Sequence, residues 1–235
     1  MADINFIGTP DYLIPLGKIL SYSDNKNANL FVLPMPGEDA SETEAIDSLG
    51  IVQYITIEGR MTGDFSSIQT KMAQLKRLAD GFQMAAFTFK SPFVSSVESI
   101  YTYTDTWVPN PITPYTFIKV TVPTKTGVQL RIGNIGTNTS ISTNTLIDST
   151  AAFVTWGTQV GDKVKNMTTG EVATITTIVS ETQVLIDLDI FTSLTAYAVT
   201  ATMYVKIMSI NPRWDLPGVG WVDYTLDLVQ VTGAR

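Results

Sequence analysis

Residues 65–81 form the one segment in which apolar side chains recur at the three- and four-residue spacing of an amphipathic helix. Asp64 or Ser66 is placed to cap its first turn, and Gly81 follows its last turn. The other regular segments are rich in β-branched and aromatic residues and predict strands at residues 51–57, 83–90, 116–122, 128–132, 203–210 and 221–231. The sequence therefore predicts a mainly β protein, with a β-sandwich or β-barrel core and one flanking α-helix.

Residues 137–202 differ in composition from the rest of the chain. Threonine accounts for 17 of these 66 residues, and six acids against two lysines give the segment a charge of −4 out of a total of −7. Its pattern predicts four short strands, at residues 163–167, 171–179, 182–188 and 196–199. We expect an inserted small β-barrel domain at 137–202, carried by a main β domain made of residues 51–136 plus 203–235.

The first 50 residues are the least regular part of the sequence, with four prolines, a polar run and an acidic run. This composition predicts an extended N-terminal arm. Two apolar groups interrupt the arm, and burying a large apolar side chain contributes about 1.5–3 kcal/mol, so we expect both groups to dock on the main domain or on a neighbouring subunit. The interface residues predicted in the arm are Tyr12, Leu13, Ile14, Leu30, Phe31, Val32 and Leu33.

Composition narrows the chemistry that is open to the chain. It contains no cysteine and no histidine, which excludes disulfides, thiol nucleophiles and Ser-His-Asp triads. A net charge of −7 argues against binding nucleic acid through a basic face. No apolar run approaches the roughly 18 residues of a membrane span, and the N-terminus lacks the pattern of a signal peptide. We expect neither specific nucleic-acid binding nor a membrane span, and the chemistry left open to the chain is that of carboxylate, lysine, serine or tyrosine side chains.

Two groups of residues are candidates for binding or chemistry. Asp187 and Asp189 share one face of a predicted strand and could hold a cation or act as an acid–base pair with Glu171 or Glu181. The simpler interpretation is that these acids form the solvent-exposed side of a strand whose other side is in the core.

Residues 91–114 predict a loop rich in aromatics and proline, in which Trp107 is a predicted interface residue. Its aromatic side chains could belong to a protein interface, to the core, or to a carbohydrate-binding platform with Trp214 and Trp221.

Two stretches carry a resemblance to a known class of proteins. A strand that ends Ile-Glu-Gly-Arg-Met-Thr-Gly-Asp at 57–64, followed by one helix and by Trp-Val-Asp-Tyr-Thr-Leu-Asp-Leu-Val at 221–229, resembles tail-tube, distal-tail, hub and baseplate proteins of tailed bacteriophages. The inserted segment is the more specific signal. Asp-Ser-Thr-Ala-Ala-Phe at 148–153 and Val-Gly-Asp-Lys-Val at 160–164 are similar to a small β-module that decorates many phage virion proteins.

The resemblance implies a non-enzymatic structural protein of a phage tail or baseplate, made in the host cytoplasm and located in the virion tail. It implies a homo-oligomeric ring that docks other tail or baseplate proteins and holds no cofactor. The competing hypothesis is a receptor- or glycan-binding module of the virion, in which the inserted domain reaches outward.

Overall fold

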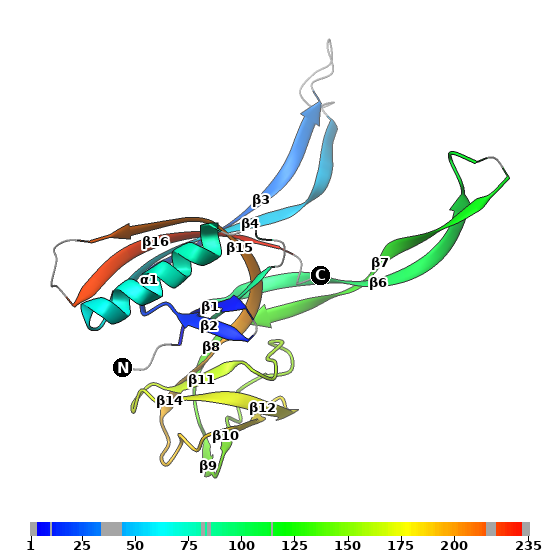
Figure 1. Ribbon diagram of the computed structural model, residues 1–235. Helices are drawn as coiled ribbons and strands as arrows, with labels where there is room; N and C mark the ends of the chain where they lie inside the picture. The colour runs from blue at the N-terminus through cyan, green and yellow to red at the C-terminus, as the bar shows by residue number, and fades with distance from the viewer. Residues whose placement is uncertain are drawn as a thin grey trace.

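The computed structural model describes residues 4–9, 11–33, 44–80, 83, 86–113, 115–214 and 220–231, and of residues 27–33, 44–52, 99, 101 and 123 it describes the backbone alone. The main domain is a seven-stranded antiparallel sheet. From one edge to the other its strands are β2 (Tyr12–Pro15), β1 (Phe6–Thr9), β5 (Phe87–Ser91), β15 (Ala201–Arg213), β16 (Trp221–Gln230), β4 (Glu44–Thr62) and β3 (Lys18–Leu33). Figure 1 shows this curved sheet with one helix lying along it.

Helix α1 (Phe65–Asp80) covers the apolar face of this sheet. Its first turn is capped by Asp64, whose Oδ2 accepts a hydrogen bond from the backbone N–H of Ser67 at 2.9 Å. Ile68, Met72 and Leu75 are buried and join the core of the main domain. The helix therefore occupies the predicted segment and uses the predicted apolar stripe.

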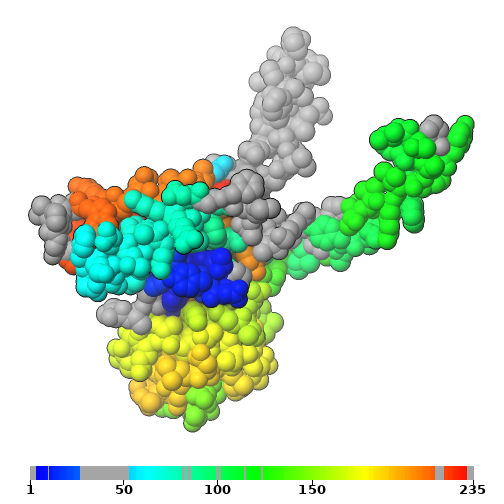
Figure 2. Space-filling view, viewed as in Figure 1, coloured from blue at the N-terminus to red at the C-terminus, as the bar shows by residue number. Residues whose placement is uncertain are grey.

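The second sheet also has seven antiparallel strands and its own core. Its strands, in spatial order, are β8 (Asn134–Thr137), β14 (Ala196–Val199), β11 (Lys163–Asn166), β12 (Val172–Ser180), β13 (Gln183–Ile186), β10 (Thr145–Ile147) and β9 (Ser140–Ser142). The sheet curls around Phe153, Phe191 and Tyr197, which are fully buried. We call this unit, residues 134–199, the insert, and it lies below the main domain in Figures 1 and 2.

The last two strands, β6 (Ser95–Pro109) and β7 (Phe117–Ile132), form a two-stranded antiparallel sheet. We call this unit the ribbon. It continues from the end of β5 and projects away from the body of the molecule in Figures 1 and 2.

The predicted mainly β class with one helix in the described residues is confirmed, and the two curled sheets have the form of half-barrels. The predicted strands at 116–122 and 128–132 form one continuous strand, β7, and the insert has seven strands where four were predicted. The structure also differs from the sequence prediction in two longer segments. Residues 6–33 contribute β1, β2 and β3 to the main sheet, because Ile7, Ile14 and Leu16 bury their side chains in its core. The segment predicted as a loop at 91–114 forms β6, since Pro92 precedes the strand and Pro109 stands at its last position, where neither interrupts the pairing.

Candidate interaction surface

The ribbon is a two-stranded sheet, so both of its strands are edge strands. Its register runs from Ser95 opposite Ile132 at the root to Pro109 opposite Phe117 at the outer end, with a bulge after Ile100. Within the described part of the chain, each of the two strands finds its only sheet partner in the other. The outer edges of β6 and β7 therefore both present free backbone donors and acceptors.

Large apolar side chains of the ribbon are exposed on both faces. Trp107 is 65% exposed and Phe117 is 62% exposed, although both belong to residue types that fill cores and interfaces. The other exposed apolar residues are Val97, Ile100, Tyr103, Ile118, Val120, Val122, Val128 and Leu130. A patch of this extent on a projecting element is typical of a protein interaction site.

The turn at the outer end is held by its own polar atoms. The N–H of Asn110 donates to the carbonyl of Thr116 at 2.8 Å. The side-chain Oδ1 of Asn110 accepts from the N–H groups of Ile112 and Thr113 at 2.9 and 3.2 Å. The turn is therefore an ordered structure, and it presents the exposed side chains of Ile112 and Tyr115.

Charge on the outer ribbon is largely neutralised within the ribbon. Lys119 Nζ lies 2.6 Å from Asp105 Oδ2, and the hydroxyl of Thr121 donates to Asp105 Oδ1 at 2.9 Å. These bonds from Lys119 and Thr121 hold the pKa of the Asp105 carboxyl below its usual range. Asp105 is thus paired with residues of the neighbouring strand of the ribbon, so its charge adds little to the cost of covering this surface with an apolar partner.

A further open edge belongs to β3, which is the outermost strand of the main sheet. The predicted interface residues of the N-terminal stretch lie partly here. Leu30 to Leu33 are in β3, opposite Asp47 to Glu44 of β4, and their side chains lie outside the described part of the structure.

The other predicted interface residues lie in β2. Tyr12 is exposed and Leu13 is half-buried, so both are accessible. Ile14 is 1% exposed and belongs to the core of the main domain. It is therefore not available to a partner, which corrects the prediction for that residue.

The carboxylates that could carry chemistry serve local structure. Asp187 Oδ1 accepts a hydrogen bond from the N–H of Thr174 at 2.7 Å. Glu181 accepts bonds from the N–H groups of Val154 and Thr155 and from the Thr155 hydroxyl, which lower the pKa of its carboxyl. Among the described residues there is no group of three or more acidic side chains placed to hold a metal ion.

The tryptophans do not form the platform that was one interpretation of the sequence. The Trp214 ring packs on Phe65 at 5.6 Å between centroids, and the guanidinium of Arg60 lies 4.1 Å from the ring centroid of Trp221. Both contacts belong to the main domain, whereas Trp107 lies on the outer ribbon. Of these three tryptophans, Trp107 is the most exposed, and its exposure is consistent with its assignment to an interface.

No protein-family model matches the chain, and a search of curated proteins finds no match. In the part of the chain that the structure describes, no helix has the length and apolarity needed to cross a membrane. The functional evidence is therefore the geometry of the ribbon and of the open sheet edges.

Proposed function

We propose that the protein is a non-enzymatic structural component of a bacteriophage tail or baseplate that acts by assembling into a homo-oligomeric ring. The observation that carries the proposal is the ribbon, with two unpaired edges and exposed apolar side chains on both faces. A two-stranded hairpin is marginally stable in water on its own, and added strands stabilise it. Copies of the chain can supply those strands.

The edges of the ribbon favour a ring over an isolated dimer. One edge is β6 and the other is β7, so pairing β6 of one copy with β7 of the next is a head-to-tail contact. Such contacts leave an open edge at each end unless the rotation between copies closes the ring. The main sheet has the same asymmetry, with β2 at one edge and β3 at the other.

Residues at the edges also support selective association. Lys119 and Lys125 lie on β7, and Pro109 ends β6. Lysine and proline on edge strands disfavour indiscriminate pairing. A wrong partner strand would bury the lysine ammonium group, and its carbonyl opposite the proline would find no N–H donor. We therefore place the interface on the ribbon, with Trp107 and Phe117 as the large side chains that a neighbour covers.

The acidic composition and the structural roles of Asp187 and Glu181 support a function without catalysis, cofactor or specific nucleic-acid binding. In this proposal the protein is made in the host cytoplasm and ends in the virion, where its ring contacts other tail or baseplate proteins. Residues 57–64, residues 221–229 and the insert resemble phage tail proteins, and this resemblance supports the proposed location in the virion tail.

The test is the mass of the assembly in solution, with a charge introduced on the ribbon. Phe117→Lys should reduce the mass measured by light scattering to that of one chain, because it places a lysine where the neighbour covers a large apolar side chain. Val179→Lys is the control, since Val179 is also an exposed apolar residue on a strand but lies in the insert. Rings of defined symmetry in negative-stain images of the wild type would support the proposal. A wild-type protein that stays a single chain at high concentration contradicts it.

The second candidate is a receptor- or glycan-binding module, and the exposed aromatics at the outer end of the ribbon favour it. Trp107, Tyr115 and Phe117 offer faces on which sugar rings could stack. Binding to a glycan array that is lost in Trp107→Ala, together with an unchanged assembly mass, would favour this candidate over the ring.

A further inference from the structure

We propose that the insert is a clamp that fixes the direction of the ribbon relative to the main domain. The segment that does this is residues 153–162, which we call the clamp loop. One end of it contacts the root of the ribbon and the other end is ion-paired to the main sheet. The importance of the clamp for ring assembly rests on the proposed function, whereas the clamp itself does not.

At the ribbon end, the clamp loop lies against β7. The N–H of Ile132 donates to the carbonyl of Trp156 at 2.8 Å. Gly157 has a φ of 68°, and a Cβ at this position would lie 1.9 Å from the carbonyl oxygen of Leu130. Glycine is therefore needed here for two reasons: the backbone conformation, and the close approach to the ribbon.

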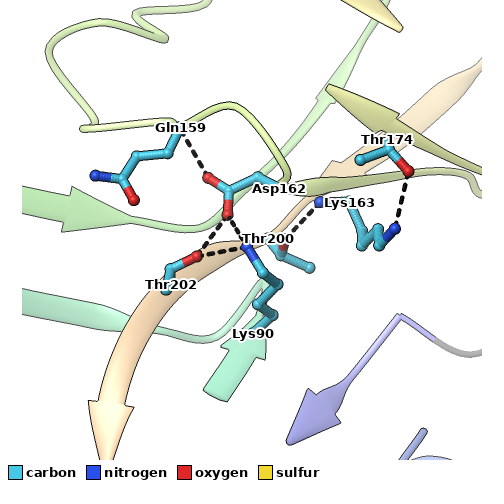
Figure 3. A network of polar contacts seen from close by, with 7 residues as sticks. All are labelled: Lys90, Gln159, Asp162, Lys163, Thr174, Thr200 and Thr202. Atoms are coloured by element: carbon cyan, nitrogen blue, oxygen red, sulfur yellow. Dashed lines mark hydrogen bonds and ion pairs between the residues drawn. The ribbon is translucent and has the colours of Figure 1, made fainter. Parts of the chain in front are cut away.

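At the sheet end, the clamp loop is held by the network in Figure 3. Lys90 of β5 reaches Asp162 at 2.9 Å between Nζ and Oδ1, and the Asp162 side chain is fully buried. Thr202 of β15 donates to the same oxygen at 2.7 Å, and Lys90 also donates to Thr202 Oγ1 at 2.8 Å. Asp162 Oδ2 accepts from the N–H of Gln159 at 2.8 Å, so the carboxylate joins two strands of the main sheet to the clamp loop.

The clamp loop is firmly attached to the rest of the insert. Phe153 is fully buried in the core of the insert, and the Trp156 ring packs edge-on against it at 5.9 Å. The carboxylate of Glu181 accepts the N–H groups of Val154 and Thr155. A displacement of the insert must therefore displace the carbonyl that Ile132 contacts.

The root of the ribbon has weaker support on its other side. Gln53 Nε2 reaches the carbonyl of Ser95 at a long 3.4 Å. Ser96 Oγ and Arg131 Nη1 are buried and make no hydrogen bond with any described residue. Arg131 Nε is ion-paired to Glu98 Oε2 at 3.2 Å, but this pair joins the two strands of the ribbon to each other. Val94, the residue before β6, is buried in the core of the main domain and attaches that strand to the body. The clamp loop adds a second attachment, on β7.

The experiment measures the direction of the ribbon in the full chain. Because the chain contains no cysteine, spin labels can be placed through Thr124→Cys on the outer ribbon and Lys76→Cys on α1, both at exposed positions. Pulsed electron paramagnetic resonance then gives the distribution of distances between the two labels. We expect a single narrow distribution for the parent and loss of that narrow peak in Gly157→Ala.

Gly161→Ala is the matched control. Gly161 also has a positive φ, of 90°, but a Cβ there meets no atom within 4 Å. Alanine at either position must adopt a positive φ, and both positions lie in the clamp loop. If Gly161→Ala keeps the narrow distribution and Gly157→Ala loses it, the loss is caused by the close approach of residue 157 to Leu130. Lys90→Met is the second variant, because it removes the ion pair of the other attachment and leaves Asp162 with only Thr202 as its partner from the main sheet, and it should also lose the narrow peak. Hydrogen exchange of β12 confirms in each variant that the insert is folded.

Three outcomes overturn the clamp: a broad distribution in the parent, a narrow one in both Gly157→Ala and Lys90→Met, or equal broadening in Gly161→Ala and Gly157→Ala. The assembly mass is measured separately on the unlabelled protein. A parent with a narrow distribution that never forms rings leaves the clamp standing and refutes the proposed function. Rings that form normally from Gly157→Ala with a broad distribution show that assembly does not use the clamp.

Discussion

The substitution Tyr197→Phe removes one hydroxyl at the centre of the insert, where it faces the side chains of Asp148 and Asn134. The hydroxyl of Tyr197 donates to Asp148 Oδ2 at 2.7 Å, and both residues are buried. The ring of Tyr197 contacts Phe153 and Phe191, with centroids 6.4 and 6.3 Å apart. Phenylalanine keeps the ring and these contacts, so the change in stability measures the loss of the hydroxyl.

The expected loss follows from the charge of the acceptor. A hydrogen bond to an ionised group contributes about 1.5–3 kcal/mol. Asp148 Oδ1 keeps its bonds from the N–H and the hydroxyl of Thr150, at 2.8 and 2.7 Å, so the carboxylate is not left unpartnered. The chain has two cores, and a single free energy of unfolding does not describe it, so the measurement is hydrogen exchange resolved by peptide. Amides of β11 and β12 should exchange roughly 10- to 150-fold faster in the variant at pH 7.

The same bond predicts a dependence on pH. Burial of Asp148 opposes its ionisation, but the hydrogen bonds from Thr150 and Tyr197 outweigh burial and lower the pKa of its carboxyl. A carboxyl whose folded-state pKa is depressed stabilises the fold above its unfolded pKa of about 3.9, and this stability is lost as the pH falls through the folded-state pKa. The difference between wild type and Tyr197→Phe should therefore shrink as the pH is lowered from 7 toward 3.

Tyr12→Phe is the control for the chemistry of the substitution, because Tyr12 is exposed. It should leave exchange of the insert unchanged at every pH. The reasoning is refuted if Tyr197→Phe exchanges like the wild type at pH 7. It is also refuted if the peptides of α1 accelerate as much as those of the insert.

Two further predictions concern α1 and can be read from hydrogen exchange of the peptides of α1 and of the main sheet, which reports on the main domain separately from the insert. Leu75→Ala should destabilise the main domain by about 2–5 kcal/mol, since Leu75 is fully buried, whereas Lys76→Ala on the exposed side should change it by less than about 0.5 kcal/mol. Equal effects would mean that the helical phase is wrong. Asp64→Ala should cost about 1 kcal/mol through loss of the cap on Ser67, and Asp80→Ala at the other end of the helix should cost less. If Asp80→Ala costs as much as Asp64→Ala, the bond to Ser67 does not act as a cap.

The parts of the fold that were predictable from sequence are those set by local patterns. Helix α1 has an apolar stripe, a capping aspartate and no competing signal, and it forms at 65–80 as expected. The predicted strand at 221–231 forms β16, and its sequence alternates strictly, with Val222, Tyr224, Leu226 and Leu228 buried on one face. In both cases the residues that decide the structure lie within a few positions of one another.

The unpredicted parts depend on contacts between distant segments. Strand β1 is four residues long and is held by pairing with β5, where Ile7 lies opposite Phe89. The pairing of β6 with β7 was hidden because the proline-rich turn at its end resembles a long loop. The contact of Lys90 with Asp162 joins residues 72 positions apart and leaves no local mark in the sequence. A lysine and an aspartate that become buried are indistinguishable in sequence from those on a solvated surface.

The correction to the N-terminal stretch moves the assembly hypothesis to another part of the molecule. The expectation that an arm at 1–50 docks on the main domain or on a neighbouring subunit depended on apolar groups that the arm could not bury by itself. Ile7, Ile14 and Leu16 are buried in the main domain of their own chain, so β1, β2 and the residues that follow them need no neighbour for this purpose. Removing residues 1–40 would delete β1, β2 and β3 and damage the sheet, and a loss of assembly would then say nothing about an interface. The physical demand itself is unchanged, because large apolar side chains exposed to water favour association. The need to cover exposed apolar side chains now applies to the ribbon, because Trp107 and Phe117 are exposed there. The outer edges of both ribbon strands are unpaired in the described chain. Substitutions at these residues leave both cores intact and therefore test the interface directly.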